Sequence, residues 1–373
     1  MKYSYFAPTE IVSGVGCVSS FGRFSLYGSK CAIITGKNMY KHNSALTDTI
    51  SALEKENISY LVINEAENNP SVKSVFDFAS RINSFGATFI IGIGGGSSMD
   101  TAKAVAIVSA NKELTEDTVF SVSSEAQSLP VILIGTTAGT GSEVMPSAVL
   151  TIPGDIPIKK SVKTKNSYAK VALCDYTYTS SMPATITVST ALDSICHAIE
   201  AIYSKRGGEW SKIYGHAALR KVMPALLKFT ENGDNDQQIR DDLYFGSILA
   251  GLAINDGGTS FPHSMGYMLT TMHETAHGFA CAVFISQFIE KISAIENISE
   301  TLNSCGMSSS EEFAEKINKI ISAYYKKPIL SLEQAQKYAD LAFKMNVNNN
   351  NLNLSRDDCV DIYLEMSKEG ACK

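Results

Sequence analysis

The feature that most constrains the fold is the regular alternation, in the first half of the chain, of short apolar runs with amphipathic segments. The apolar runs have the length of buried strands and occupy residues 31–35, 60–63, 87–92 and 130–134. Segments with helical spacing follow the first three runs, at residues 45–56, 72–85 and 100–110. Because strands that alternate with helices form a parallel sheet covered on both faces, we predict an α/β domain with a Rossmann-like sheet.

The second half of the chain has a different pattern, in which long helical segments follow one another without strands between them. These predicted helices occupy residues 189–203, 211–229, 239–254, 279–295 and 310–325. The change in pattern near residue 180 predicts two domains, an α/β domain over residues 1–180 and an all-helical domain over residues 181–373.

Charge and cysteine usage exclude several classes of function. The formal net charge is −6, and no run of Lys and Arg suggests binding to nucleic acid or to an anionic membrane. The first residues contain no apolar core of signal-peptide type, and no apolar stretch approaches the ~18 residues of a membrane span. The eight cysteines form no Cys-x-x-Cys pair and are expected to be reduced thiols. We therefore expect a cytoplasmic protein.

Two loops that follow predicted strands are candidates for binding phosphate. Gly92 to Asp100 reads GIGGGSSMD and joins a strand to a helix, where free backbone N–H groups favour an anion. Thr136 to Glu143 reads TTAGTGSE and follows the next strand. Each loop alone is also consistent with a simple tight turn. Two such loops at the carboxyl ends of two strands favour one phosphate-rich ligand, such as a dinucleotide.

The end of the first predicted strand bears on the choice of cofactor. An acidic residue there would accept the ribose 2′-hydroxyl of NAD and repel the 2′-phosphate of NADP. This chain has Gly36 and Lys37 instead, which favours NADP or the use of both cofactors. Lys37 is equally consistent with an ordinary surface lysine.

Asp193 and His197 are the first candidates for binding a metal. Their i, i+4 spacing places both side chains on one face of a helix, one turn apart. That is the geometry of two ligands of one ion, although a surface Asp–His pair has the same spacing.

His263 and His277 are the second pair of candidates, and they lie 14 positions apart. On one straight helix they would be about 21 Å apart and could not share an ion. Pro262 and the polar stretch from Thr270 to Thr275 predict that the chain breaks between them. One carboxylate and three imidazoles would then suit Fe(II) or Zn with a position open for substrate.

The other three histidines have different neighbours in the sequence. His273 precedes His277 by one turn and is a candidate to line the site. His42 and His216 have no neighbouring metal-binding side chains in the sequence and are expected to be ordinary histidines.

Taken together, these segments resemble the iron-containing (group III) alcohol dehydrogenase family over nearly the whole chain. The resemblance is carried by Gly94–Ser97 with Asp100 and Lys103, by the loop from Thr136 to Glu143, and by the four candidate metal ligands. It implies a dehydroquinate synthase-like fold, with an N-terminal nucleotide-binding domain and a C-terminal helical domain that binds the metal. By the same resemblance, the residues that contact the cofactor would be Asn69, Gly95, Gly96, Ser97, Thr136, Thr137 and Lys160.

One position departs from the family pattern in a way that bears on catalysis. Many members have a further histidine four residues after the one matched by His263, whereas this chain has Tyr267. Tyr267 would keep a hydroxyl near the nicotinamide, or the proton would move through His273 or water.

The resemblance implies reversible oxidation of a small primary alcohol, diol or hydroxy acid with NAD(P). It also implies Fe(II) as the metal, with Zn able to occupy the same ligands, and a homodimer or higher oligomer in which residues 3–12 add a strand across the interface. Two alternatives stay open: a glycerol or polyol-phosphate dehydrogenase on the same fold, and a non-catalytic nucleotide-binding relative.

Overall fold

The computed structural model describes residues 4–37, 41–154, 157–233 and 236–369. The chain divides into two compact units. The α/β unit comprises Phe6–Thr137 and Gly141–Met182. The helical unit comprises Pro183–Lys373 together with two short pieces, Met1–Tyr5 and Ala138–Thr140.

The α/β unit is built on a parallel sheet of six strands in the order β1-β8-β5-β4-β2-β3. Its strands are β1 (Glu10–Ser13), β2 (Lys30–Gly36), β3 (Ser59–Ala66), β4 (Phe89–Gly94), β5 (Val131–Gly135) and β8 (Val171–Cys174). The predicted parallel sheet is confirmed, and the strand order reverses direction between the neighbouring strands β2 and β4. The carboxyl ends of these strands are where ligands bind in folds of this type.

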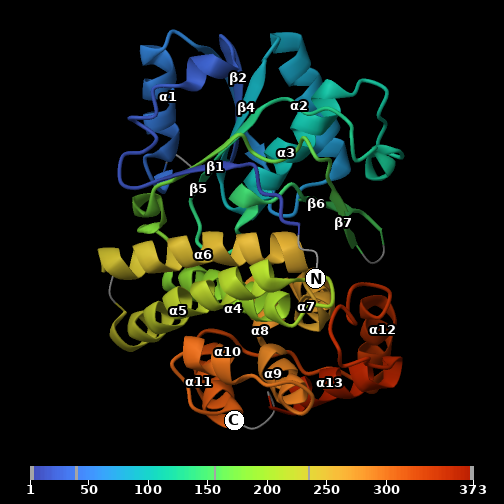
Figure 1. Cartoon of the computed structure of the whole chain (residues 1–373). Helices are drawn as coiled ribbons and strands as arrows, with labels where there is room; N and C mark the ends of the chain where they lie inside the picture. The colour runs from blue at the N-terminus through green and yellow to red at the C-terminus, as the bar shows by residue number, and fades with distance from the viewer. Residues whose placement is uncertain (1–3, 38–40, 155–156, 234–235, 370–373) are drawn as a thin grey trace. The chain divides into compact units, whose positions relative to one another are not determined.

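Helices cover both faces of this sheet because successive side chains of each strand point to opposite faces. The helices are α1 (Ala45–Lys55), α2 (Val72–Phe85) and α3 (Gly96–Ala110). On β2, Ala32 and Ile34 join a core with α2 and α3, whereas Cys31 and Ile33 join a second core with α1. Figure 1 shows α1 on one side of β2 and β4, with α2 and α3 on the other.

Two smaller features complete the α/β unit. Strands β6 (Ala148–Ile152) and β7 (Ile158–Val162) form an antiparallel hairpin outside the main sheet. Short 3-10 helices lie at Phe24–Tyr27 (η1), Val119–Ser121 (η3), Ser142–Val144 (η4) and Tyr176–Thr179 (η5).

The helical unit consists of ten helices in its described residues. They are α4 (Ala184–Ile202), α5 (Glu209–Asn232), α6 (Gln237–Gly257), α7 (Phe261–Met272), α8 (His277–Ala282), α9 (Ile285–Ser293), α10 (Ser299–Ser304), α11 (Ser310–Tyr324), α12 (Leu332–Ala342) and α13 (Arg356–Glu369). Helices α4, α5 and α6 pack side by side, and α8 packs against both α4 and α7 (Figure 1). The prediction that this half is all-helical is confirmed.

The N-terminal segment pairs within the chain. Strand β1 lies beside β8 in parallel, with Glu10 opposite Val171. Tyr3, the first residue of the segment expected to cross a dimer interface, lies outside the described residues. Within the described part of the chain, no helix is both long enough and apolar enough to span a membrane.

Candidate metal centre and cofactor-binding loops

Three helices of the helical unit bring the four candidate metal ligands together. Asp193 and His197 lie one turn apart on α4, His263 lies in the first turn of α7, and His277 begins α8. The predicted break between the two later histidines is confirmed, because α7 ends at Met272 and α8 begins at His277. Pro262 occupies the first turn of α7, where a missing N–H is tolerated, and so starts this helix.

The distances from Asp193 to the three histidines are close to those of ligands that share an ion, although His197 is not among the donors that all lie within 4.8 Å of one another. Asp193 Oδ1 lies 3.9 Å from His197 Nε2, 3.4 Å from His263 Nε2 and 4.0 Å from His277 Nε2. Two ligand atoms about 2.1 Å from one ion in tetrahedral geometry are roughly 3.4 Å apart. The structure therefore brings together all four residues that the sequence suggested.

The buried polar atoms of this cluster fit a bound cation. Asp193 Oδ1 and His263 Nε2 are both buried and have no hydrogen-bond partner among the described residues. An unpaired buried carboxylate oxygen is costly, and a divalent cation would satisfy both atoms at once. A carboxylate with three imidazoles suits Fe(II) or Zn(II), so the residues present fit the metal that the resemblance implied.

Hydrogen bonds behind the histidines set which ring nitrogen faces the cluster. His263 Nδ1 contacts Glu200 Oε1 at 2.5 Å, and Glu200 also accepts hydrogen bonds from the backbone N–H groups of Ser260 and His263. Glu200 is fully buried. Thr270 Oγ1 lies 3.3 Å from His277 Nδ1. In both rings Nε2 is left facing Asp193, as in carboxylate–histidine–metal arrangements.

Sequence reasoning did not assign Glu200 a role. The signal was nevertheless present, because Asp193, His197 and Glu200 follow an i, i+4, i+7 spacing on one helix face.

The electrostatics of the cluster favour a charged carboxylate at Asp193 and a neutral imidazole at His197. Burial alone would raise the pKa of Asp193, but the adjacent His197, His277 and His263 hold it below its usual value. Burial lowers the pKa of His197 to about 4, although Asp193 opposes this shift. Both residues are thus in the protonation state that metal binding requires at neutral pH. Burial would lower the pKa of His263 and of His277, but Cys281 with Glu200 raises the first and Cys281 with Asp193 raises the second.

Two close contacts set the distances between the three helices. A Cβ added to Gly278 on α8 would lie 1.7 Å from the Ser189 carbonyl oxygen of α4. A Cβ on Gly266 of α7 would lie 2.8 Å from the Ala280 carbonyl oxygen of α8. Any larger side chain at either position would push the helices apart, so glycine is needed for the ligands to meet.

The two residues predicted to be catalytic lie in different surroundings. Tyr267 stacks on His277, with ring centroids 5.3 Å apart and planes 25° apart. Burial raises the pKa of Tyr267 to about 12, so its hydroxyl is protonated at neutral pH. His273 caps the end of α7, and its Nε2 lies 3.1 Å from the hydroxyl of Tyr338 on α12. No contact between the described residues joins His273 to the Asp193 cluster.

In the α/β unit, most of the predicted cofactor contacts lie together at the carboxyl ends of β4 and β5. The Thr136 N–H donates to the Gly94 carbonyl oxygen, and a Cβ on Gly95 would lie 3.2 Å from Thr137 Oγ1. The Asn69 N–H donates to Ser97 Oγ at 3.3 Å. Helix α3 begins at Gly96, four residues earlier than predicted, so the backbone N–H groups of Gly96 and Ser97 lie in its first turn.

Gly36 and Lys37 lie at the end of β2. A Cβ on Gly36 would lie 3.7 Å from Ser98 Oγ, which places Gly36 beside the first turn of α3. Lys37 is exposed.

Lys160 points away from these loops, and its neighbour Lys159 points toward them. Lys160 is exposed on β7, and its ammonium lies over the ring of Phe120, 4.9 Å from the centroid. Side chains alternate along a strand, so Lys159 takes the opposite face. Its Nζ donates to Thr151 Oγ1 at 2.8 Å, and Thr151 Oγ1 donates to the Asn69 carbonyl oxygen.

The surroundings of Lys159 shift its pKa. Burial lowers the pKa of Lys159 to about 8, although Asp100 opposes this shift. The sequence did not single out Lys159, and only the register of the hairpin distinguishes it from Lys160.

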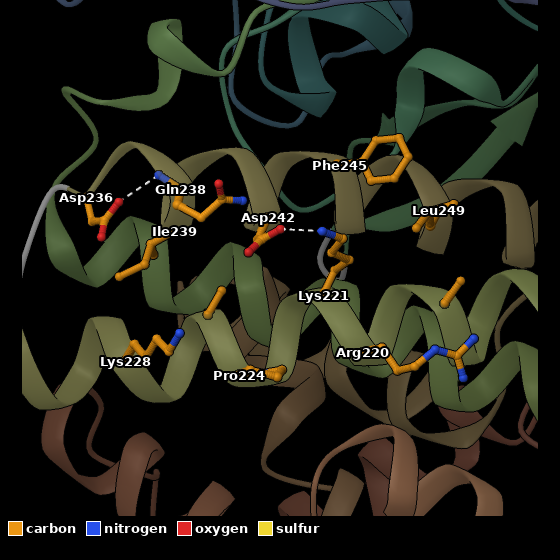
Figure 2. Close-up of a pocket in the computed structure, with 12 residues that line it drawn as sticks. Arg220, Lys221, Pro224, Lys228, Asp236, Gln238, Ile239, Asp242, Phe245 and Leu249 are labelled. Carbon is orange, nitrogen blue, oxygen red and sulfur yellow. Dashed lines mark hydrogen bonds and ion pairs between the residues drawn. The ribbon is translucent and has the colours of Figure 1, made fainter.

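A separate groove on the helical unit contains none of these residues. It lies between α5 and α6, has a volume of about 440 Å³ and is lined in part by Lys228, Asp236 and Phe245 (Figure 2). Two of its charged residues are already paired, because Lys221 Nζ lies 2.6 Å from Asp242 Oδ1. The groove gathers no set of metal-binding side chains, so the metal cluster is the better candidate for chemistry.

Comparison with known protein families identifies the family of this chain. The family model described as iron-containing alcohol dehydrogenase matches residues 8–176, and the model of the C-terminal part of the same family matches residues 187–367. This chain belongs to the iron-containing alcohol dehydrogenase family. Membership makes it an oxidoreductase of the alcohol dehydrogenase type.

Individual members of the iron-containing alcohol dehydrogenase family resemble the chain over most of its length. The NAD-dependent methanol dehydrogenase of Bacillus methanolicus is 29% identical, over 75% of this chain and 73% of that protein. The NADPH-dependent butanol dehydrogenase of Clostridium saccharobutylicum is 27% identical, over 76% of this chain and 72% of that protein. The crystal structure of an iron-containing alcohol dehydrogenase from Thermotoga maritima superposes with a TM-score of 0.88 and 29% identity, over 98% of this chain and 100% of that one.

Proposed function

We propose that this chain is a metal-dependent NAD(P)H alcohol dehydrogenase that interconverts small primary alcohols and aldehydes. The observation that carries the proposal is the convergence of Asp193, His197, His263 and His277 from three helices, with buried donor atoms that have no hydrogen-bond partner. Family membership supports the reaction class.

The proposed roles divide between the four ligands and the residues around them. A divalent ion held there, Fe(II) or alternatively Zn(II), would act as a Lewis acid that acidifies the alcohol and polarises the aldehyde. Asp193 contributes the negative charge of the donor set, and the three histidines contribute neutral nitrogen. Glu200 holds the Nδ1 proton of His263 so that Nε2 stays free for the ion.

Tyr267 is proposed to orient the substrate. Its raised pKa keeps the hydroxyl protonated, so it donates a hydrogen bond to the substrate oxygen and does not act as a base. Stacking on His277 fixes the ring in place. We assign no proton-relay role to His273, because its ring is engaged by Tyr338.

The cofactor is proposed to bind the α/β unit through the loops at Asn69, Gly95–Ser97 and Thr136–Thr137. The N–H groups of the first turn of α3 favour a phosphate, and Lys159 adds a positive charge beside Asn69. A nicotinamide cofactor held by these residues would supply the hydride transfer. The absence of an acidic residue at Gly36–Lys37 favours NADP(H) over NAD(H).

The experiment is an aldehyde panel, including butanal, assayed anaerobically with NADPH or NADH after loading with Fe(II) or Zn(II). Wild type is expected to oxidise the cofactor, and His263→Ala is expected to stay folded while losing bound metal and most activity. Unchanged metal content and rate in His263→Ala would refute the assignment. A kcat/KM at least about tenfold higher with NADH, one step of ~1.4 kcal/mol, would refute the NADP preference.

A further inference from the structure

A fifth potential donor lies in the cluster, the thiol of Cys281. Cys281 follows His277 by one turn of α8, so both side chains project from the same face of that helix. Its side chain is fully buried. One donor atom from each of Asp193, His263, His277 and Cys281 lies within 4.8 Å of the other three. The sulfur is therefore inside the cluster.

The spacing of the sulfur matches that of a ligand. Cys281 Sγ lies 3.8 Å from His277 Nε2. An ion about 2.3 Å from sulfur and about 2.1 Å from nitrogen, with angles of about 90–120° between neighbouring ligands of a five-coordinate site, holds those two atoms roughly 3.1–3.8 Å apart. The sulfur is thus at ligand-to-ligand distance from His277 Nε2, and it lies 3.9 Å from Nδ1 of the same ring.

The imidazole rings of the other members pack against one another. His197 stacks on His263, with ring centroids 4.5 Å apart and planes 18° apart. His277 crosses His263 at 72°. The buried atoms His263 Nε2 and Asp193 Oδ1 have no hydrogen-bond partner among the described residues, so they are available to the same ion as the sulfur.

We propose that Cys281 is a thiolate ligand of the ion held by Asp193, His197, His263 and His277. This inference rests on the metal site proposed above. As the metal–sulfur bond forms, the thiol proton passes to solvent, with no change in oxidation state of sulfur or metal. Because thiolate is a soft donor, Cys281 shifts the preference of the site toward Zn(II) relative to a set made of carboxylate and imidazole alone.

The test uses Co(II) as a spectroscopic probe in the full-length protein. Wild type, Cys281→Ser and Cys281→Ala are freed of metal and titrated with CoCl₂. Cys196→Ala is the matched control, because Cys196 is equally buried and lies beside His197, outside the donor group. A cobalt–thiolate bond adds a near-ultraviolet charge-transfer band, whereas the visible d–d bands report bound cobalt with or without sulfur.

We expect the charge-transfer band in wild type and in Cys196→Ala, and its loss in both Cys281 variants while their d–d bands remain. Zn(II) affinity should fall by at least about tenfold in Cys281→Ser, with a smaller change for Fe(II). Wild type with d–d bands but no charge-transfer band, or a band that survives in Cys281→Ala, would overturn the role of Cys281 and leave the metal site intact. No cobalt binding by wild type would overturn the metal site and this inference together.

Discussion

At the scale of single residues, the buried carboxylate of Glu200 fixes the orientation and the tautomer of the His263 ring. It accepts from the Ser260 N–H and the His263 N–H and contacts His263 Nδ1 at 2.5 Å, so all its partners belong to the start of α7. One side chain therefore anchors both the helix that carries the ligand and the tautomer of the ligand itself.

Replacing Glu200 with glutamine tests this role. The amide keeps the shape but removes the charge that holds the Nδ1 proton, so metal affinity should fall by roughly ten- to a hundredfold. The measurement is competition for Zn(II) against a chromophoric chelator. Glu300→Gln is the control, because Glu300 also pairs with a histidine, His216 at 3.3 Å, but its side chain is 76% exposed. Equal affinities for the two variants and wild type would contradict the assignment.

The lowered pKa of Lys159 predicts a pH dependence for cofactor binding. With a pKa of about 8, the ammonium is charged below that pH and neutral above it. Only the charged form attracts phosphate, so the dissociation constant of NADPH should rise as pH increases through about 8. Binding is measured by the quenching or enhancement of NADPH fluorescence.

Two variants at neighbouring positions provide the comparison. Lys159→Gln should weaken NADPH binding by about tenfold at neutral pH, the loss of a charge-assisted hydrogen bond of ~1.5 kcal/mol, and should flatten the profile near pH 8. Lys160→Gln, whose parent side chain lies over Phe120, should change little. If Lys160→Gln had the larger effect, the family-based assignment of Lys160 would be the correct one.

Sequence patterns selected four residues that the structure brings together as proposed metal donors, but they did not single out the residues around them, for a physical reason. Asp193 and His197 share one helix, so their spacing alone brings them together. The distinction between Lys159 and Lys160 depends on the register of β7 against β6, in which Lys160 lies opposite Leu150. A one-residue shift in register exchanges the faces of a strand, and the local sequence does not fix that register.

At the scale of elements, the packing of α8 against α4 is as important as the ligands themselves. Gly278→Ala places a Cβ where the Ser189 carbonyl oxygen lies, so α8 must move outward and carry His277 with it. Overpacking of this kind costs about 1–3 kcal/mol. We expect a lower thermal midpoint and a substoichiometric metal content, measured by calorimetry and elemental analysis.

Gly233→Ala is the control that distinguishes the effect of this close contact from the effect of ordinary backbone strain. Gly233 ends α5 with a φ of +67°, and a Cβ there would meet nothing within 4 Å. Its replacement should cost about 1 kcal/mol through the left-handed conformation alone and leave metal content unchanged. A full metal complement in Gly278→Ala would show that the close contact is not what positions His277.

Several boundaries of the elements differ from the predictions, and tertiary packing explains two of them. Helix α4 begins at Ala184, five residues before the predicted start, through a β-branched stretch that has low helical propensity. The buried side chains of Thr187 and Val188 show that packing overrides that propensity. Helix α3 begins within the glycine cluster, where Gly95 lies against Thr137.

Other elements had no clear signal in the sequence that would have predicted them. The predicted helix over residues 279–295 is two helices, α8 and α9, and neither glycine nor proline marks the break at Val283–Phe284. The hairpin β6–β7 was not predicted, since one of its strands, Ile158–Val162, is largely polar and exposed. Strands β1 and β8 have four residues each, too few for a periodic pattern to stand out.

At the scale of the whole molecule, the two proposed sets of binding residues belong to different compact units. The proposed cofactor contacts Asn69, Gly95–Ser97 and Thr136–Thr137 belong to the α/β unit, and the proposed metal donors belong to the helical unit, which also includes the loop segment Ala138–Thr140. Binding of the two groups should therefore be separable. Protein treated with a chelator is expected to bind NADPH with an affinity within about threefold of the loaded protein, while aldehyde reduction is lost and returns with Fe(II) or Zn(II).

The same preparation gives a stability readout. An ion that binds only the folded chain stabilises it by about 2.7 kcal/mol at a concentration of 100 times its Kd, so the thermal midpoint should rise with added metal. His263→Ala should show no such rise. Loss of NADPH binding on chelation would mean that the two groups of residues do not act independently.

The distribution of the proposed ligands over α4, α7 and α8 has a consequence for how the helical unit opens. An ion coordinated by Asp193 and His277 links positions 84 residues apart in the chain, and these three helices cannot separate without breaking a coordination bond. The later helices α10 to α13 carry none of these ligands. In the loaded protein, amide hydrogens of α4, α7 and α8 would exchange only through global unfolding, whereas those of α10 to α13 would exchange through local opening.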